Sequence, residues 1–115
     1  MHGAVLPYAF SVVAASGTHV TLRFDARTVV GVGFPWRFTT TLTYALTGDG
    51  LAVTTTVANV DVEDFPAGFG YHPYLVRELV PGRGEALLEA GVPGSGIHVL
   101  APGEEVTGRF ALRVP

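Results

Sequence analysis

The sequence predicts an all-β fold, an antiparallel β-sandwich or barrel, on three observations. Apolar and polar residues alternate with a period of two in several segments, as expected for strands with one buried face. Glycines and prolines separate these segments. Apolar residues nowhere recur at helical spacing for three turns. A chain of 115 residues has the size of one domain, so we expect a single domain over residues 1–115.

The clearest alternating segment runs from Trp36 to Leu46. Its apolar face comprises Trp36, Phe38, Leu42, Tyr44 and Leu46, and its polar face comprises Arg37, Thr39, Thr41 and Thr43. Glycine and aspartate follow in Thr47-Gly-Asp-Gly50, and a second threonine-rich segment extends over 51–59. Two alternating segments joined by such a turn predict a β-hairpin.

The remaining strands are expected at shorter segments. Residues 20–25 alternate well, with Val20, Leu22 and Phe24 on one face. Further strands are predicted over residues 9–16, 67–71, 85–89, 96–100 and 106–114. Many short strands with glycine and proline between them favour a sandwich or a barrel.

Composition excludes several classes of function. Hydrophobic residues make up 48% of the chain and charged residues 15%, which argues against disorder. The net charge is −3 and the arginines are scattered, so we expect no nucleic-acid partner. The absence of cysteine excludes disulfides, thiolate metal sites and cysteine nucleophiles. No signal peptide or membrane span is evident, so we expect a soluble cytoplasmic protein without a membrane partner.

The residue types most suited to chemistry cluster in Phe65–Tyr74, which ends in Gly-Tyr-His-Pro-Tyr. Aromatic rings suit the C–H face of a pyranose, and the neutral imidazole of His72 can donate or accept a proton near pH 7. The alternative is a structural histidine that caps a strand end through a backbone hydrogen bond. The residue types alone leave both interpretations open.

The other polar residues carry weaker signals. We expect His2 near a frayed terminus, and His19 and His98 at the surface. Glu89 ends a short apolar run before a glycine- and proline-containing loop, where it could enter a cleft or simply end a strand. The acidic residues of the loop 61–64 lack the spacing of an EF-hand, and we expect no metal site and no cofactor.

Several segments, taken in order, resemble the aldose 1-epimerase (galactose mutarotase-like) family. They are His2-Gly3, Gly33–Phe38, Leu42–Leu46, Gly50–Thr54, Val57–Asn59, Gly68–Leu75 and Gly96–Val114. Each segment alone is weakly specific, whereas their order and spacing together are more so. The resemblance covers most of residues 2–75 and 96–114. It implies that the β-sandwich is part of the large galactose mutarotase-like supersandwich.

The resemblance also implies an activity. Members of the family interconvert the α and β anomers of free aldohexoses such as glucose and galactose. A histidine protonates the ring oxygen while a carboxylate removes the proton of the anomeric hydroxyl. By resemblance, His72 is the general acid and Glu89 stands nearest to the place of the catalytic base. His2, Tyr71, Tyr74 and Trp36 are expected to bind the sugar.

The chain departs from the family pattern in ways that leave its activity open. It is shorter than family enzymes, and its start within the first motif suggests a shortened gene. Leu6 stands where an arginine is often found, and a substrate-binding aspartate has no counterpart between Leu75 and Gly96. The alternative is a catalytically inactive carbohydrate-binding or assembly module of the same fold; an unrelated interaction domain fits the ordered motifs less well. A shortened sandwich would leave sheet edges and part of an apolar face exposed, so we expect a homodimer or a higher assembly.

Overall fold

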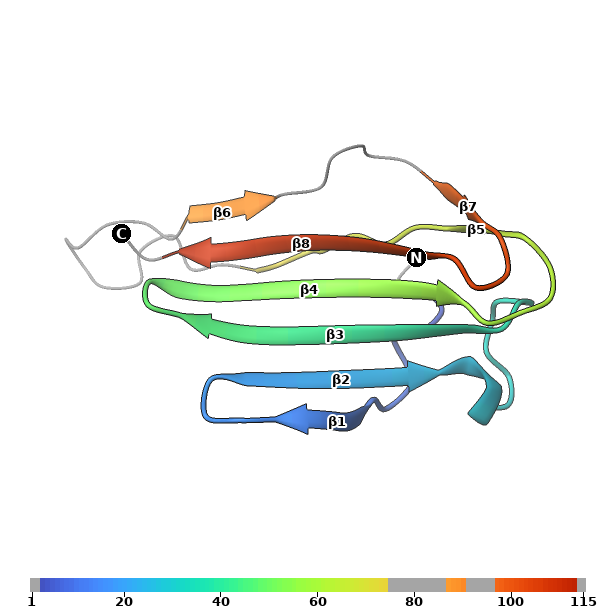
Figure 1. Cartoon of the computed structure of the whole chain (residues 1–115), viewed down its shortest axis with the longest axis horizontal. Helices are drawn as coiled ribbons and strands as arrows, with labels where there is room; N and C mark the ends of the chain where they lie inside the picture. Colours follow the sequence, from blue (N-terminus) through green and yellow to red (C-terminus); the bar gives the residue numbers. More distant parts are fainter. Residues whose placement is uncertain (1–2, 75–86, 91–96, 114–115) are drawn as a thin grey trace.

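The structure, a computed structural model, describes residues 3–74, 87–90 and 97–113. Its larger sheet has six antiparallel strands in the order β1-β2-β3-β4-β8-β6, and a second sheet has two strands, β5-β7 (Figure 1). The strands are β1 (Ser11–Ala15), β2 (His19–Asp25), β3 (Phe38–Thr47), β4 (Gly50–Asn59), β5 (Phe65–Ala67), β6 (Leu87–Ala90), β7 (His98–Leu100) and β8 (Glu105–Arg113). The described residues contain no α-helix, only a 3₁₀ turn, η1 (Ala26–Thr28). The predicted all-β antiparallel fold is confirmed.

The predicted hairpin is formed by β3 and β4, which pair without a register shift from Phe38 opposite Asn59 to Thr47 opposite Gly50. The apolar face of β3 is the one expected from alternation, because residues two apart point to the same side of a sheet. The strand begins at Phe38, however, so Trp36 lies in the preceding loop rather than in the strand.

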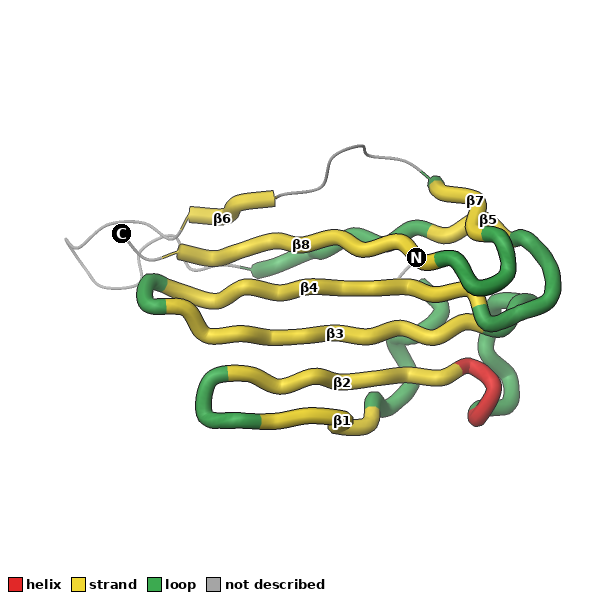
Figure 2. Tube along the Cα trace, viewed as in Figure 1, coloured by secondary structure: helices red, strands yellow, loops and turns green. Residues whose placement is uncertain are grey.

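Five of the six shorter strands lie close to their predicted positions, and one does not. The prediction of a strand over residues 67–71 is wrong, because β5 covers Phe65–Ala67 and residues 68–74 belong to no strand. β5 pairs with β7 through Phe65 opposite Leu100. The residues after β5 instead run across a face of the larger sheet as a loop, drawn green in Figure 2.

The hydrophobic core lies on one face of the larger sheet, where β2 ends and β3 begins. Its buried members are Phe24, Phe38, Val57, Phe65, Ala67 and Leu100. Phe24 and Phe38 belong to the larger sheet, and Phe65 and Leu100 come from the smaller one. The Phe24 and Phe38 rings lie 5.8 Å apart, and Phe34 meets both Phe38 and Phe65 edge-on at 5.5 Å. Burying an aromatic side chain of this size stabilises the fold by about 1.5–3 kcal/mol, so these rings hold the two layers together.

The opposite face of the larger sheet is polar. Threonines occupy it on neighbouring strands, and their hydroxyls bond across the strands, Thr21 with Thr43 at 3.1 Å and Thr56 with Thr107 at 2.7 Å. A sheet with one apolar and one polar face is typical of antiparallel proteins that cover one side only. The second layer therefore packs on the apolar face.

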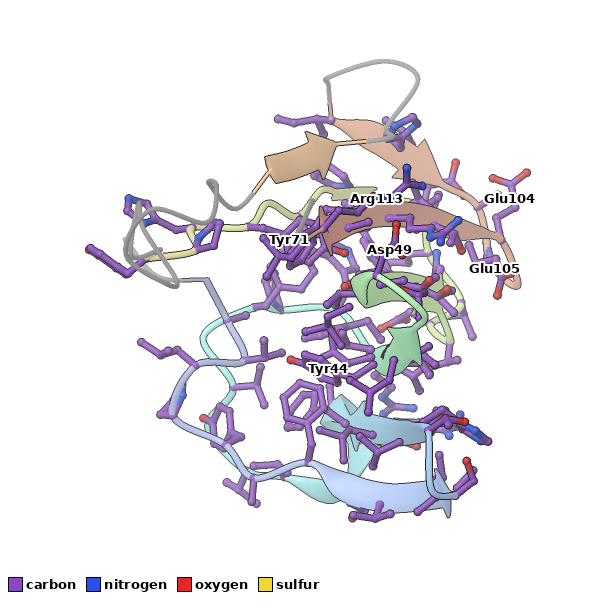
Figure 3. The ribbon with its side chains drawn as sticks, turned by 90° about the vertical axis from the view of Figure 1, so that its left-hand side faces the viewer. Tyr44, Asp49, Tyr71, Glu104, Glu105 and Arg113 are labelled. Carbon is purple, nitrogen blue, oxygen red and sulfur yellow. The ribbon has the colours of Figure 1, made fainter. Side chains whose placement is uncertain are left out.

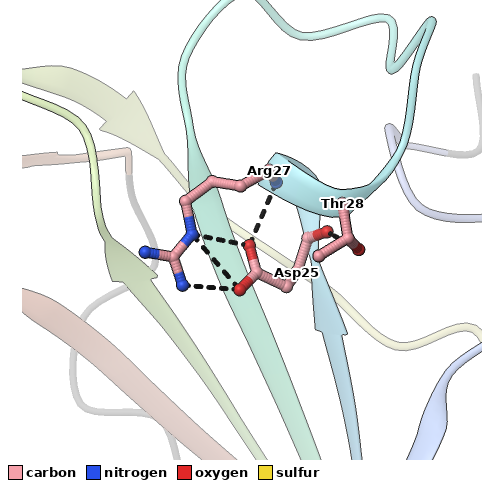
Figure 4. A network of polar contacts seen from close by, with 3 residues as sticks. All are labelled: Asp25, Arg27 and Thr28. Carbon is pink, nitrogen blue, oxygen red and sulfur yellow. Dashed lines mark hydrogen bonds and ion pairs between the residues drawn. The ribbon is translucent and has the colours of Figure 1, made fainter.

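A carboxylate determines where β2 ends. Asp25 accepts hydrogen bonds from the backbone N–H of Arg27 at 3.0 Å and from its guanidinium at 2.6–3.2 Å, and its own carbonyl accepts from the Thr28 hydroxyl (Figure 4). The side-chain hydrogen bond from Arg27 is the largest influence on the pKa of Asp25 and lowers it, whereas burial acts in the opposite direction. The carboxylate thus caps η1 and turns the chain away from the sheet.

Candidate functional site

The segment Gly68–Tyr74 leaves β5 and is anchored on the apolar face of the larger sheet by Tyr71. The Tyr71 hydroxyl donates to Oγ1 of Thr55 at 2.6 Å and lies 3.4 Å from the carbonyl oxygen of Gly108. Its ring lies over that of Phe110, with centroids 4.3 Å apart. Thr55 and Gly108 are directly opposite one another on β4 and β8. Because Gly108 has no side chain, the tyrosine can reach the backbone here.

Burial is the main influence on the Tyr71 phenol. It raises the pKa of Tyr71, the hydrogen bond with Thr55 opposes this effect, and Tyr44 adds to it. Figure 3 shows Tyr44 and Tyr71 on the same side of the larger sheet. The phenol is therefore neutral near pH 7 and serves as a hydrogen-bond donor to the sheet.

The next residues of the segment are open to solvent. His72 and Tyr74 are both exposed, Tyr74 to 90%, and their rings lie 4.9 Å apart. Phe69 and Tyr71, by contrast, are half-buried and contact each other at 6.0 Å. The two aromatics that anchor the segment thus leave an imidazole and a phenol ring together at the surface. This arrangement offers a proton donor beside a flat apolar face.

Trp36 packs against aromatic residues other than His72 and Tyr74. The centroid of its indole lies 5.1 Å from that of the Phe34 ring and 5.9 Å from that of the Phe65 ring, on which it stacks. Phe65 precedes His72 by seven residues in the sequence. With five other residues it lines an open depression of about 490 Å³. Among the described residues, no ring contact joins Trp36 to His72 or Tyr74.

The depression beside Trp36 is shaped by a carboxylate. Asp61 accepts hydrogen bonds from the backbone N–H groups of Arg37 at 2.6 Å and Val62 at 2.7 Å. These two bonds, the one from Arg37 first, lower the pKa of Asp61. Its oxygens therefore hold the loop in place. Among the described residues, no group of three or more His, Asp or Glu side chains is arranged to hold a metal ion.

Two of the predicted site residues fall partly or wholly outside what the structure describes. His2 lies outside the described residues. The backbone of Glu89 lies in β6, opposite Ala111 of β8, and its side chain is not among those described. The next residue, Ala90, is opposite Phe110, on whose ring Tyr71 packs. β6 is therefore beside the strand on which the His72 segment is anchored, but in this register Ala90 rather than Glu89 is at a position on the face of β8 where Tyr71 packs.

The other histidines lie at the surface, as expected from the sequence. His19 is exposed and its Nδ1 lies 2.6 Å from the Ser16 hydroxyl, while His98 is exposed in β7. No helix in the described part of the chain is long and apolar enough to cross a bilayer.

Sequence reasoning missed the residues that hold Tyr71, namely Thr55 and Gly108. One signal for them was present: Gly108 interrupts an alternating strand, and an isolated glycine in a strand often marks a close backbone approach. Nothing in the local sequence indicated that Tyr71 is the residue that approaches Gly108.

Comparison with known families identifies a match. The family model described as aldose 1-epimerase matches residues 1–82 of the 115-residue chain. The matched range contains Trp36, Tyr71, His72 and Tyr74 and ends before Glu89. Comparisons with curated proteins and with solved structures give no match.

Proposed function

The chain belongs to the aldose 1-epimerase family, and on this basis we propose that it binds a free aldohexose such as glucose or galactose and interconverts its α and β anomers. The observation that carries the proposal is the family match over residues 1–82, which contains the exposed His72 beside Tyr74. A catalyst of this reaction needs a proton donor that a sugar ring can reach, and an exposed imidazole meets that need.

In the proposed reaction His72 and a carboxylate exchange protons with the sugar. The imidazolium of His72 protonates the ring oxygen while the carboxylate removes the proton of the anomeric hydroxyl, and the bond between the anomeric carbon and the ring oxygen breaks. The open-chain aldehyde rotates about its first carbon–carbon bond. The ring then closes on the other face with both protons returned, so no net proton is consumed. We keep Glu89 as the proposed carboxylate; in β6 it is opposite Ala111, one residue out of step with Phe110, on which Tyr71 packs.

The aromatic residues have separate roles in this proposal. Tyr74 presents its ring face to the C–H groups of the sugar beside His72. Tyr71 binds Thr55 through its hydroxyl, so it acts as a positioning residue that holds His72 and Tyr74 outward. We keep His2 as a proposed contact to sugar hydroxyls. Trp36 lies in its own depression, so a sugar contact by Trp36 would be separate from the one at His72.

A second function is favoured by one observation: the family match ends at residue 82, before the residue assigned as the base. A chain that retains the sugar-binding segment without a productive carboxylate would be a carbohydrate-binding module of the same fold. Such a module would bind the sugar without accelerating anomer exchange, which separates the two functions experimentally.

Polarimetry tests the enzymatic proposal. Freshly dissolved α-D-glucose or α-D-galactose is followed with micromolar protein, and we expect relaxation faster than in buffer alone. Because general acid catalysis contributes about 10²–10⁴-fold, His72→Gln should reduce the protein-dependent rate by about 100-fold or more. The matched control is His98→Gln, which removes another exposed imidazole and should leave the rate unchanged.

The outcomes separate the alternatives. An absence of acceleration by the unaltered protein overturns the enzymatic proposal, and an equal loss in both variants removes His72 from its assigned role. Chemical-shift changes on addition of sugar without acceleration, abolished by Tyr74→Ala, would identify the binding module.

A further inference from the structure

β1 forms an exposed edge of the larger sheet. It is the terminal strand in the order β1-β2-β3-β4-β8-β6, and among the described strands it pairs only with β2 (Figure 1). All five of its residues are exposed, including Val12 at 63% and Val13 at 55%. Such an edge presents backbone N–H and C=O groups that another strand can pair with.

The usual protections of an edge strand are scarce here. Natural edges are commonly blocked by lysine, by other charged side chains, by proline or by a bulge. β1 has the sequence Ser-Val-Val-Ala-Ala, and residues 3–22 contain no Asp, Glu, Lys or Arg. The one device present is a bulge, which leaves Val13 without a residue opposite it in β2. The strand is therefore open to pairing over an uncharged stretch.

The apolar face of the sheet is incompletely covered at this edge. Val12 is opposite Leu22, which is in turn opposite Leu42, so the exposed valine continues an apolar row across three strands. A strand added beside β1 would extend this row and remove Val12 from solvent. We propose that β1 pairs antiparallel with β1 of a second copy of the chain, which joins two larger sheets across a two-fold axis.

A second copy fits this edge because the edge is self-complementary. An antiparallel pair of identical strands satisfies two-fold symmetry, the commonest symmetry of soluble oligomers. Each chain carries a net charge of −3, but β1 contains no charged residue. The first Asp, Glu, Lys or Arg in the sequence is Arg23, in the neighbouring strand β2. Two copies therefore meet without like charges in the paired strands. A charged partner would find no ion-pair donor or acceptor in β1.

The size of the contact predicts a weak dimer. Five paired residues per copy bury less than the roughly 1,200–2,000 Å² of a stable interface. We therefore expect mostly monomer at about 10 µM and a substantial dimer fraction at about 1 mM, as measured by sedimentation velocity. A monomer throughout that range overturns the proposal.

Charge substitution tests the position of the contact. Val12→Lys and Val13→Lys place a lysine on the edge, and we expect each to weaken dimerisation by at least about tenfold. The matched control is Val30→Lys, at a valine that is 98% exposed outside the strands, and it should leave the dimer unchanged. An equal loss in the control would locate the interface elsewhere and overturn the assignment to β1.

Cross-linking tests the pairing itself, and the chain is suited to it because it contains no cysteine. Single cysteines introduced at residues 11 to 15 in turn should form intermolecular disulfides most readily at the position on the two-fold axis. Residues directly opposite there lie about 4.5–5.5 Å apart between Cα atoms, within reach of a disulfide. Equal cross-linking at all five positions, or equally strong cross-linking by Val30→Cys, would contradict an ordered β1 pair.

Discussion

Asn59 offers a sharp test of how the two layers are joined, through the isosteric substitution Asn59→Asp. The side chain is 1% exposed at the end of β4. Its amide nitrogen donates to the carbonyl oxygens of Glu63 at 2.8 Å and Leu100 at 2.7 Å, and its amide oxygen accepts from the N–H of Asp61 at 2.8 Å. One side chain thus connects β4, the loop after it and β7.

Aspartate preserves the shape and the acceptor but removes both donors. Loss of the two donated bonds costs about 1 kcal/mol each. The new oxygen also faces two carbonyl oxygens, and the bond at Leu100 is buried, which adds about 1–3 kcal/mol for the unsatisfied acceptor. We therefore expect the free energy of unfolding to fall by about 3–5 kcal/mol at pH 7. That is a large part of the roughly 5–15 kcal/mol typical of a domain.

Urea unfolding measures this loss, with the fluorescence of the single tryptophan, Trp36, as the probe. Because burial opposes ionisation, we expect the introduced carboxyl to have a raised pKa. The protonated acid can donate to one carbonyl, so the difference from the unaltered protein should shrink between pH 7 and pH 5. The control Thr56→Val removes an exposed bond of 2.7 Å and should cost less than about 1 kcal/mol. A loss below about 1 kcal/mol for Asn59→Asp, or one that does not change with pH, would refute this reasoning.

Two further outcomes follow from close contacts and from charge. An added Cβ at Gly50 would lie 1.9 Å from the carbonyl oxygen of Leu112, whereas one at Gly48 would meet nothing within 4 Å. Thermal unfolding should therefore show a loss of about 1–3 kcal/mol or more for Gly50→Ala and little change for Gly48→Ala, and equal losses would contradict the close packing of β4 on β8. Folding lowers the pKa of Asp25 and Asp61, so their contribution to stability is complete above their unfolded pKa of about 4. This stabilisation is lost as the pH falls through the lower folded pKa values. Asp25→Asn should therefore weaken the dependence of the unfolding free energy on pH, as measured by urea unfolding at pH 2 to 5. An unchanged dependence would count against the Arg27 contact.

Much of the fold could be predicted because its determinants are local. The β3–β4 hairpin follows from alternation with a period of two and from a turn of glycine and aspartate, and both signals lie within the residues concerned. The start of β3 at Phe38 could not be predicted in this way. Trp36 continues the alternating pattern, but Phe34 and Phe65 draw its ring into the core from a loop.

The candidate site likewise combines features that the local sequence determines with features that only tertiary contacts determine. The sequence by itself determined which residue types could carry chemistry, since an imidazole between two tyrosines is visible without a structure. Only the tertiary structure decided that the segment after β5 is not a strand, because Tyr71 meets a hydroxyl 16 residues earlier and a glycine carbonyl 37 residues later. These distant partners fix Tyr71 against the sheet and leave His72 and Tyr74 exposed together. The Trp36 ring instead packs against Phe34 and Phe65. Local patterns encode the strands, but the position of a side chain relative to another depends on contacts that no local pattern contains.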